Sequence, residues 1–193
     1  MSHELMQRLE QEYETVCAAP SDIQQHLPTL KRFADQCQSV TEFGVRWGVS
    51  SRAFLYSQAK KLTMYDLALD QGVYELVSFC QAHGKAVSYQ AGNTLDINIE
   101  QTDLLFIDTL HTYSQLLAEL NRHSSKVNKY IVFHDTHTFG CIDEGSWGGP
   151  GLLTAVVQWL AENPSWRVVY HTYINNGLTI VERINRPITL QGP

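Results

Sequence analysis

The chain has 193 residues, of which 44% are hydrophobic and 18% are charged, and its formal net charge is −6. This composition is typical of one globular domain and excludes a long disordered segment or a coiled coil. The acidic balance argues against a nucleic-acid partner, and no apolar run reaches the roughly 18–20 residues of a membrane span. We therefore expect a cytoplasmic protein without nucleic-acid or membrane partners, whose four cysteines are reduced thiols.

The beginning of the chain is predicted to be helical. Apolar residues recur at helical spacing over residues 2–18, and Pro20 ends this pattern. A capping box at residues 21–24 and Pro28 then predict short helices up to about residue 36. The predicted organisation is a single domain over 1–193, with N-terminal helices at 1–37, a core at 38–183 and a tail at 184–193.

The core alternates short apolar runs with helical patterns, which predicts an α/β domain with a mostly parallel sheet. The last two strands are predicted to form a hairpin, because Asn175, Asn176 and Gly177 tolerate positive φ angles in its turn. Residues 138–151 are rich in glycine and predict a surface loop beside the site. The expected strands are 39–43, 62–65, 86–90, 104–107, 130–133, 167–173 and 178–183, and the expected helices after the first strand end near residues 60, 83 and 162, with another beginning at 112.

Polar residues follow the predicted parallel strands where each strand ends. In an open α/β sheet, ligands bind at the edge formed by the carboxyl ends of the strands. The sequence therefore predicts one site at this edge, to which five polar residues contribute: Glu42, Asp66, Asp108, His134 and Asp135.

The segment after the first strand has glycines at Gly44 and Gly48, which permit a tight turn and close approach of a ligand. Their spacing differs from the GxGxxG pattern of dinucleotide sites, and no Walker lysine follows, so nicotinamide cofactors and nucleoside triphosphates fit poorly. Asp66 follows the next strand about 20 residues later, where a carboxylate can accept hydrogen bonds from both hydroxyls of a ribose.

The ordered set of motifs is similar to that of class I S-adenosylmethionine-dependent methyltransferases. The set comprises ExGxxxGxS after the first strand, an acid after the second, GNTLD after the third and FIDxxHxY at the fourth. Within this class the chain most resembles small bacterial metal-dependent O-methyltransferases, whose layout is that of catechol O-methyltransferases. The resemblance implies a Rossmann-like, doubly wound sheet of seven strands, mostly parallel with an antiparallel last strand.

The resemblance also implies roles for matching residues. The first-motif acid and glycine loop would hold the amino-acid portion of S-adenosylmethionine, Asp66 would bind its ribose, and the segment after the third strand would contact its adenine. The cofactor-binding residues implied in this way are Glu42, Gly44, Gly48, Ser50, Asp66, Asn93, Thr94 and Asp108.

In the metal-dependent group, an aspartate after the fourth strand and an acidic pair after the fifth bind Mg²⁺. The matching residues are Asp108, His134 and Asp135, and His134 departs from the acidic pattern. A mixed oxygen and nitrogen set suits Mn²⁺, Fe²⁺, Co²⁺ or Zn²⁺ at least as well as Mg²⁺. The alternative is a decayed site in which His134 only forms hydrogen bonds.

His111 lies three residues after Asp108, at the offset where related enzymes carry the general base. A neutral imidazole with a pKa near 6.5 can take a proton from a metal-bound hydroxyl. We therefore expect methyl transfer from S-adenosylmethionine to a hydroxyl of a small molecule, such as a sugar, a phenol or a natural-product intermediate. Two alternatives remain, a cofactor-binding protein without catalysis and a metal-dependent hydrolase, and the sequence leaves open whether the protein is a homodimer.

Overall fold

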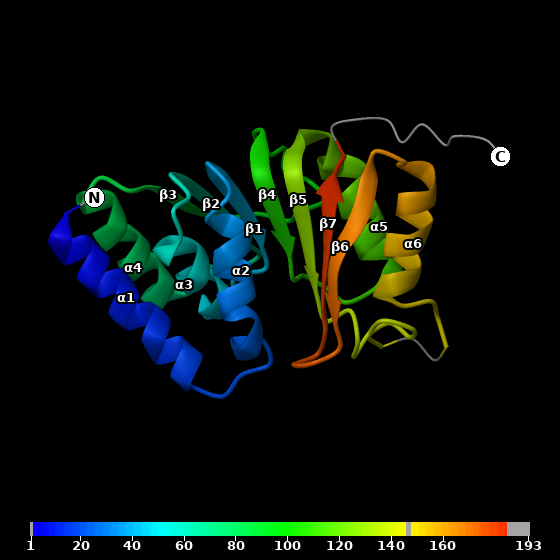
Figure 1. Cartoon of the computed structure of the whole chain (residues 1–193), viewed down its shortest axis with the longest axis horizontal. Helices are drawn as coiled ribbons and strands as arrows, with labels where there is room; N and C mark the ends of the chain where they lie inside the picture. The colour runs from blue at the N-terminus through cyan, green and yellow to red at the C-terminus, as the bar shows by residue number, and fades with distance from the viewer. Residues whose placement is uncertain (1, 146–147, 185–193) are drawn as a thin grey trace.

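Seven strands form one twisted sheet at the centre of the computed structural model, which describes residues 2–145 and 148–184 (Figure 1). The strand order is β3-β2-β1-β4-β5-β7-β6, and β7 is antiparallel to both of its neighbours. The predicted doubly wound sheet with an antiparallel last strand is therefore confirmed. The strands are β1 (Ser39–Phe43), β2 (Lys61–Asp66), β3 (Ala86–Ala91), β4 (Thr102–Ile107), β5 (Val127–His134), β6 (Trp166–Thr172) and β7 (Leu178–Arg183).

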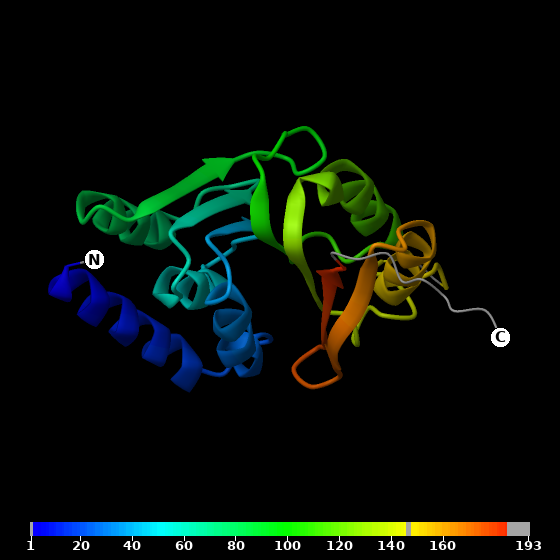
Figure 2. The ribbon, with the colours of Figure 1, turned by 45° about the horizontal axis from the view of Figure 1, so that its top comes forward.

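Helices cover both faces of the sheet, as Figure 2 shows from a second angle. One face packs against α1 (His3–Ala18), α2 (Leu27–Ala34), α3 (Val49–Tyr56) and α4 (Gln71–Ala82), and the other packs against α5 (Tyr113–His123) and α6 (Leu152–Glu162). Two single-turn 3₁₀ helices, η1 (Gln24–His26) and η2 (Ser124–Lys126), connect longer elements. No helix within the described ranges has the length and hydropathy needed to cross a bilayer.

The central strand β4 shows why an unbroken apolar run predicted a strand buried on both sides. All six of its residues are buried. Leu104 and Phe106 belong to the core under α1–α4, whereas Leu105 and Ile107 belong to the core under α5 and α6. Because side chains alternate between the faces of a strand, one run supplies two cores.

Two predicted helices end earlier than expected. Helix α2 ends at Ala34 and α3 ends at Tyr56, where residues near 36 and 60 were expected. At the end of α3, Ser57 adopts an extended backbone and its hydroxyl donates to the carbonyl of Phe54 at 2.7 Å. Serine competes with the helix by such local bonds, which explains the early end.

The segment between α1 and α2 lies beside the β6–β7 turn (Figures 1 and 2). Asn175 in this turn accepts a bond from the Gln25 amide at 2.8 Å and donates to the carbonyl of Ser21 at 2.8 Å. Its backbone carbonyl lies 3.0 Å from His26 Nε2. These contacts hold residues 21–26 over the carboxyl edge of the sheet, so the segment forms a wall of the site described next.

Candidate functional site

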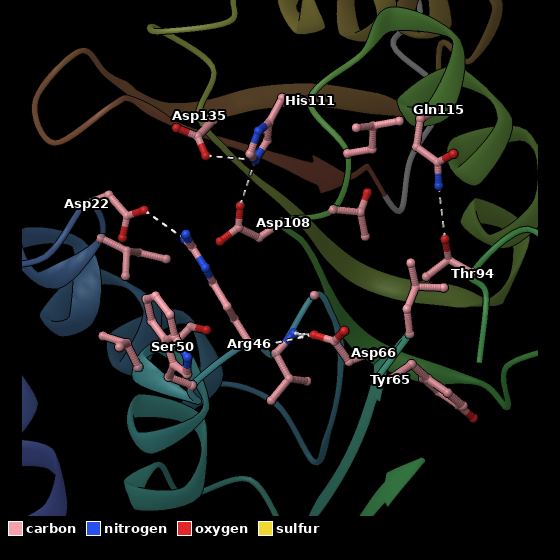
Figure 3. Close-up of a pocket in the computed structure, with 18 of the residues that line it drawn as sticks. Asp22, Arg46, Ser50, Tyr65, Asp66, Thr94, Asp108, His111, Gln115 and Asp135 are labelled. Atoms are coloured by element: carbon pink, nitrogen blue, oxygen red, sulfur yellow. Dashed lines mark hydrogen bonds and ion pairs between the residues drawn. The ribbon is translucent and has the colours of Figure 1, made fainter. Parts of the chain in front are cut away.

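A cavity of about 520 Å³ lies at the carboxyl ends of β1, β2, β4 and β5 (Figure 3). The structure brings most of the predicted site residues to it. Those that line the cavity are Gly44, Ser50, Asp66, Asn93, Thr94, Asp108, His111 and Asp135. Three predicted residues, Glu42, Gly48 and His134, are not part of its lining.

Glu42, on β1, is fully buried, and its side chain contacts the start of α3. Its carboxylate accepts hydrogen bonds from the hydroxyls of Ser50 at 2.5 Å and Ser51 at 2.7 Å. Burial raises the pKa of Glu42 to about 8, against the lowering effect of these two hydrogen bonds. The predicted contact of Glu42 with a cofactor therefore remains a prediction, and any such contact would pass through Ser50.

The raised pKa predicts an unusual pH dependence of stability. Between the ordinary value of 4.5 and about 8, the native state retains a proton that the unfolded chain has released. The free energy of unfolding therefore falls as pH rises through this range, by at most about 1.4 kcal/mol per pH unit from this group. Urea denaturation from pH 5 to 8.5 should show a smaller loss of stability in Glu42→Gln than in wild type. Parallel curves would contradict this prediction, and exposed Glu14 provides the matched control variant Glu14→Gln.

Gly48 has a structural role at the beginning of α3. It is the N-cap of α3 with a φ of 71°, and a Cβ added there would lie 2.7 Å from Val73 Cγ2. The left-handed backbone favours glycine, and a Cβ would also force the Val73 side chain to shift. Its predicted role toward a cofactor remains a prediction.

Asp66 extends from the end of β2 into the cavity and also fixes the glycine loop. Its Oδ2 accepts hydrogen bonds from the amides of Val45 and Arg46, both at 2.7 Å. Oδ1 has one longer contact, 3.3 Å from the Ala68 amide. Oδ1 is thus the more available acceptor for a ribose hydroxyl, and the predicted ribose role stays a prediction.

Thr94, at the predicted adenine end, is positioned by a buried carboxylate that sequence reasoning missed. Its hydroxyl donates to Glu119 at 2.5 Å, and Gln115 donates to both residues, at 3.1 Å to Thr94 and 2.8 Å to Glu119. Burial raises the pKa of Glu119. The neighbouring Asn93 side chain accepts from the Leu95 amide at 3.0 Å, which shapes the turn after β3.

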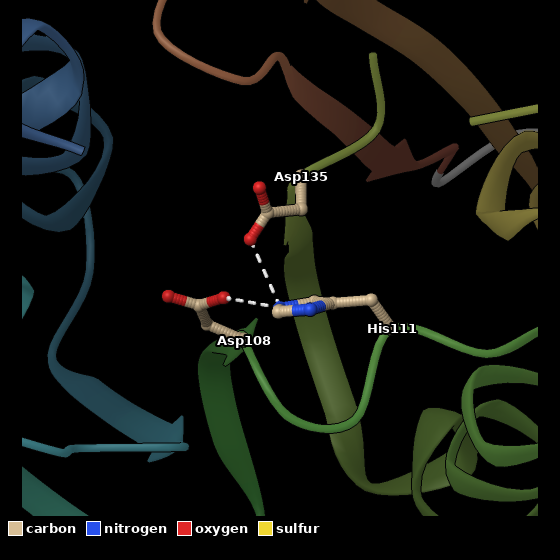
Figure 4. A group of neighbouring side chains, drawn as sticks. All are labelled: Asp108, His111 and Asp135. Atoms are coloured by element: carbon tan, nitrogen blue, oxygen red, sulfur yellow. Dashed lines mark hydrogen bonds and ion pairs between the residues drawn. The ribbon is translucent and has the colours of Figure 1, made fainter. Parts of the chain in front are cut away.

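Asp108, His111 and Asp135 form a cluster whose ligand atoms all lie within 4.8 Å of one another (Figure 4). His111 Nε2 lies 3.3 Å from Asp108 Oδ1 and 2.9 Å from Asp135 Oδ2. On its other side, Nδ1 lies 2.9 Å from Glu144 Oε2, and the ring stacks on Phe139 at 4.8 Å. The imidazole is therefore held in one orientation by three carboxylates and an aromatic ring.

His134 lies behind this cluster, with a side chain only 1% exposed. Its Nδ1 is 3.3 Å from Asp108 Oδ1 and 3.1 Å from Asp135 Oδ2. Its Nε2 faces the backbone carbonyls of Asp22 at 3.2 Å and Asn175 at 3.3 Å. Since carbonyls only accept, Nε2 carries a proton, as in metal-binding histidines that donate to a carbonyl from the second nitrogen.

The protonation state of His111 depends on whether a cation is bound beside it. Burial lowers the pKa of His111, but hydrogen bonds and charge from Asp108 and Asp135 outweigh it and raise the pKa to about 10. In the protein without a bound cation, the ring is therefore an imidazolium at neutral pH, and the role of a neutral base at the cation-bound site remains a prediction. His111 can accept a proton only when another cation neutralises the two carboxylates.

Asp135 combines a strained backbone conformation with a buried carboxylate oxygen that lacks a hydrogen-bond partner. It is 3% exposed and has a φ of 58°, a backbone conformation that non-glycine residues rarely adopt. Its Oδ1 is buried without a hydrogen-bond partner. A buried carboxylate oxygen without a donor is costly, and a bound cation would satisfy it.

Three residues of this site were not singled out in the sequence analysis. Asp22 reaches the cavity from the segment before α2, Arg46 from the middle of the glycine loop, and Glu144 from the loop at 138–151. Arg46 could have been suspected, because it lies between the two glycines. Trp147, in the predicted loop at 138–151, lies outside the described residues.

Comparison with known proteins identifies the fold. No protein-family model matches the sequence, and neither does any curated protein. The N-methyltransferase NodS from Bradyrhizobium japonicum WM9, solved with S-adenosyl-L-homocysteine, aligns with a TM-score of 0.63 and 16% identity over 94% of this chain and 99% of that chain. Methyltransferase PaMTH1 from Podospora anserina, also solved with this ligand, aligns with a TM-score of 0.61 and 14% identity over 91% and 87% of the two chains.

A third neighbour is a Staphylococcus aureus protein provisionally named as a caffeoyl-CoA O-methyltransferase. It aligns with a TM-score of 0.61 and 16% identity, over 95% of this chain and 93% of that chain. The structural neighbours are thus S-adenosylmethionine-dependent methyltransferases, O-methyltransferases among them. The chain has the Rossmann-like fold of this class, in a single domain.

Proposed function

We propose that the protein transfers a methyl group from S-adenosylmethionine to a hydroxyl of a small molecule, with the help of a divalent metal ion. One observation carries this proposal: the glycine loop, Asp66 and the Asp108–His111–Asp135 cluster line the same cavity. A methyl donor over the glycine loop would then lie beside a group of acids and a base. The methyltransferase fold of the neighbours supports the assignment.

The donor set fits a transition-metal ion. Asp108 and Asp135 would supply carboxylate oxygens and His134 its Nδ1, since Nε2 of His134 is committed to two carbonyls. Mixed oxygen and nitrogen ligands favour Mn²⁺, Fe²⁺, Co²⁺ or Zn²⁺ over Mg²⁺. When bound, such an ion makes a coordinated hydroxyl more acidic.

His111 is the histidine that lines the cavity, and we assign it the role of general base. Its Nδ1–H donates to Glu144, so Nε2 carries the lone pair once the charge of the aspartates is neutralised. The acceptor hydroxyl gives its proton to Nε2. Its oxygen then forms a bond to the methyl carbon as the carbon–sulfur bond breaks, and the electron pair stays on sulfur in S-adenosylhomocysteine.

Two binding titrations with purified protein, one by calorimetry and one by electron paramagnetic resonance, test the two parts of the proposal. We expect S-adenosylhomocysteine to bind at micromolar concentrations, and Mn²⁺ to bind in a separate titration followed by electron paramagnetic resonance. No binding of S-adenosylhomocysteine at millimolar concentration would contradict methyl transfer. Binding of the nucleoside with no Mn²⁺ site would instead favour the metal-free alternative, in which the fold binds a cofactor without this catalysis.

A further inference from the structure

The charges around the cavity are unevenly distributed. Four of the residues that line it within the described ranges are aspartates, Asp22, Asp66, Asp108 and Asp135, whereas Arg46 is the one lysine or arginine among them. A ligand that fits this surface carries net positive charge and one negative group opposite Arg46. S-adenosylmethionine has this pattern, since it bears a sulfonium, an ammonium and a single carboxylate.

Arg46 has a backbone conformation that arginine rarely adopts. Its φ is 51°, and its amide donates to Asp66 Oδ2. The side chain crosses the mouth of the cavity to Asp22, at 3.2 Å, as Figure 3 shows, and packs over the Trp47 ring at 4.5 Å. The Arg46 and Asp22 side chains are 66% and 47% exposed, so their ion pair is weak and can be exchanged for a ligand at little cost.

Several donors of the glycine loop are already in use. The Ser50 hydroxyl is hydrogen-bonded to the buried Glu42 carboxyl group at 2.5 Å. The amides of Val45 and Arg46 donate to Asp66. Those of Gly44 and Gly48 donate to the carbonyls of Tyr65 and Val45. The guanidinium of Arg46 is the one charged donor within residues 44–50, and its side chain is 66% exposed.

We propose that Arg46 binds the α-carboxylate of the methionine part of S-adenosylmethionine, replacing Asp22 as its partner. This inference rests on the proposed function. The planar guanidinium can donate two parallel hydrogen bonds to a carboxylate, a geometry that neither a serine nor a lysine provides. Arg46 is thus a cofactor-specificity residue that separates amino-acid-bearing nucleosides from those without a carboxylate.

A double-mutant cycle with matched ligands tests this role. The variant Arg46→Met keeps the length of the side chain and removes its charge. The ligands are S-adenosylhomocysteine and its decarboxylated analogue S-adenosyl-3-thiopropylamine, which differ only in the carboxylate. Calorimetry on the full chain should show about 10- to 100-fold weaker binding of S-adenosylhomocysteine to the variant, and an unchanged affinity for the analogue. Arg32→Met, at an exposed position of α2, controls for the loss of one positive charge.

The possible outcomes separate this inference from the proposed function. Equal weakening of both ligands would mean that Arg46 only shapes the loop, and unchanged binding of both would mean that it does not contact the cofactor; either result would overturn the inference alone. Failure of wild-type protein to bind S-adenosylhomocysteine would overturn the proposed function and this inference together. Because Arg46 is exposed, thermal melting should show that Arg46→Met folds as wild type does.

Discussion

Replacement of His111 by alanine is expected to lower kcat for methyl transfer by about 10²- to 10⁴-fold, the usual contribution of a positioned general base. The variant should still bind S-adenosylhomocysteine, because in the proposed mechanism the imidazole acts on the acceptor hydroxyl rather than on the nucleoside. An interaction made only in the transition state lowers kcat and kcat/KM together. Steady-state kinetics with an acceptor found by screening sugars and phenols measures both parameters.

Measurement of metal binding shows whether His111 acts as the base or as a metal ligand. The His111 ring lies close enough to Asp108 and Asp135 to coordinate an ion itself. In the proposed arrangement His111→Ala keeps its Mn²⁺ site, whereas His134→Ala and Asp135→Asn lose it. Loss of Mn²⁺ binding in His111→Ala would show that His111 is a ligand and would contradict its role as the base. His83→Ala, at the C-cap of α4, is the matched control and should retain both activity and metal.

The parts of the fold that were predicted correctly depend on local patterns. Strand β4 is buried on both faces, so its apolar run is continuous, and the turn at 175–177 needs residues that accept positive φ. The carboxyl ends of parallel strands meet at one edge whatever the details of packing. For this reason Asp66, Asp108 and Asp135 could be placed together before any coordinates were known.

The details of the site depend on contacts between distant segments, which no local pattern encodes. Asp22 reaches the cavity because Asn175, more than 100 residues away, binds the backbone on either side of it. Glu144 reaches His111 from a loop without periodicity. The pKa of His111 is a further example, since it depends on two carboxylates whose distances follow from packing alone.

Gly44 is the position where the glycine loop touches the Asp108–His111–Asp135 cluster, and Gly44→Ala is expected to damage both. A Cβ at this position would lie 1.8 Å from the backbone oxygen of Asp108 and 2.6 Å from its carbonyl carbon, and the φ of Gly44 is 80°. Backbone atoms cannot move aside as a flexible side chain would. The left-handed strain and the overlap together should lower the free energy of unfolding by about 3 kcal/mol or more.

The variant Gly84→Ala serves as the control that separates the effect of the atomic overlap on stability from the effect of the backbone strain. Gly84 also has a φ of 80°, but a Cβ there would meet nothing within 4 Å. Gly84→Ala should therefore show the strain alone, about 1–2 kcal/mol in urea denaturation. The excess cost in Gly44→Ala measures how tightly the β1 loop packs on Asp108. If the two variants were equally destabilised, the ends of β1 and β4 would not be in the contact described. If the excess is found, Gly44→Ala should also weaken Mn²⁺ binding, because relief of the overlap displaces the backbone that carries the Asp108 carboxylate.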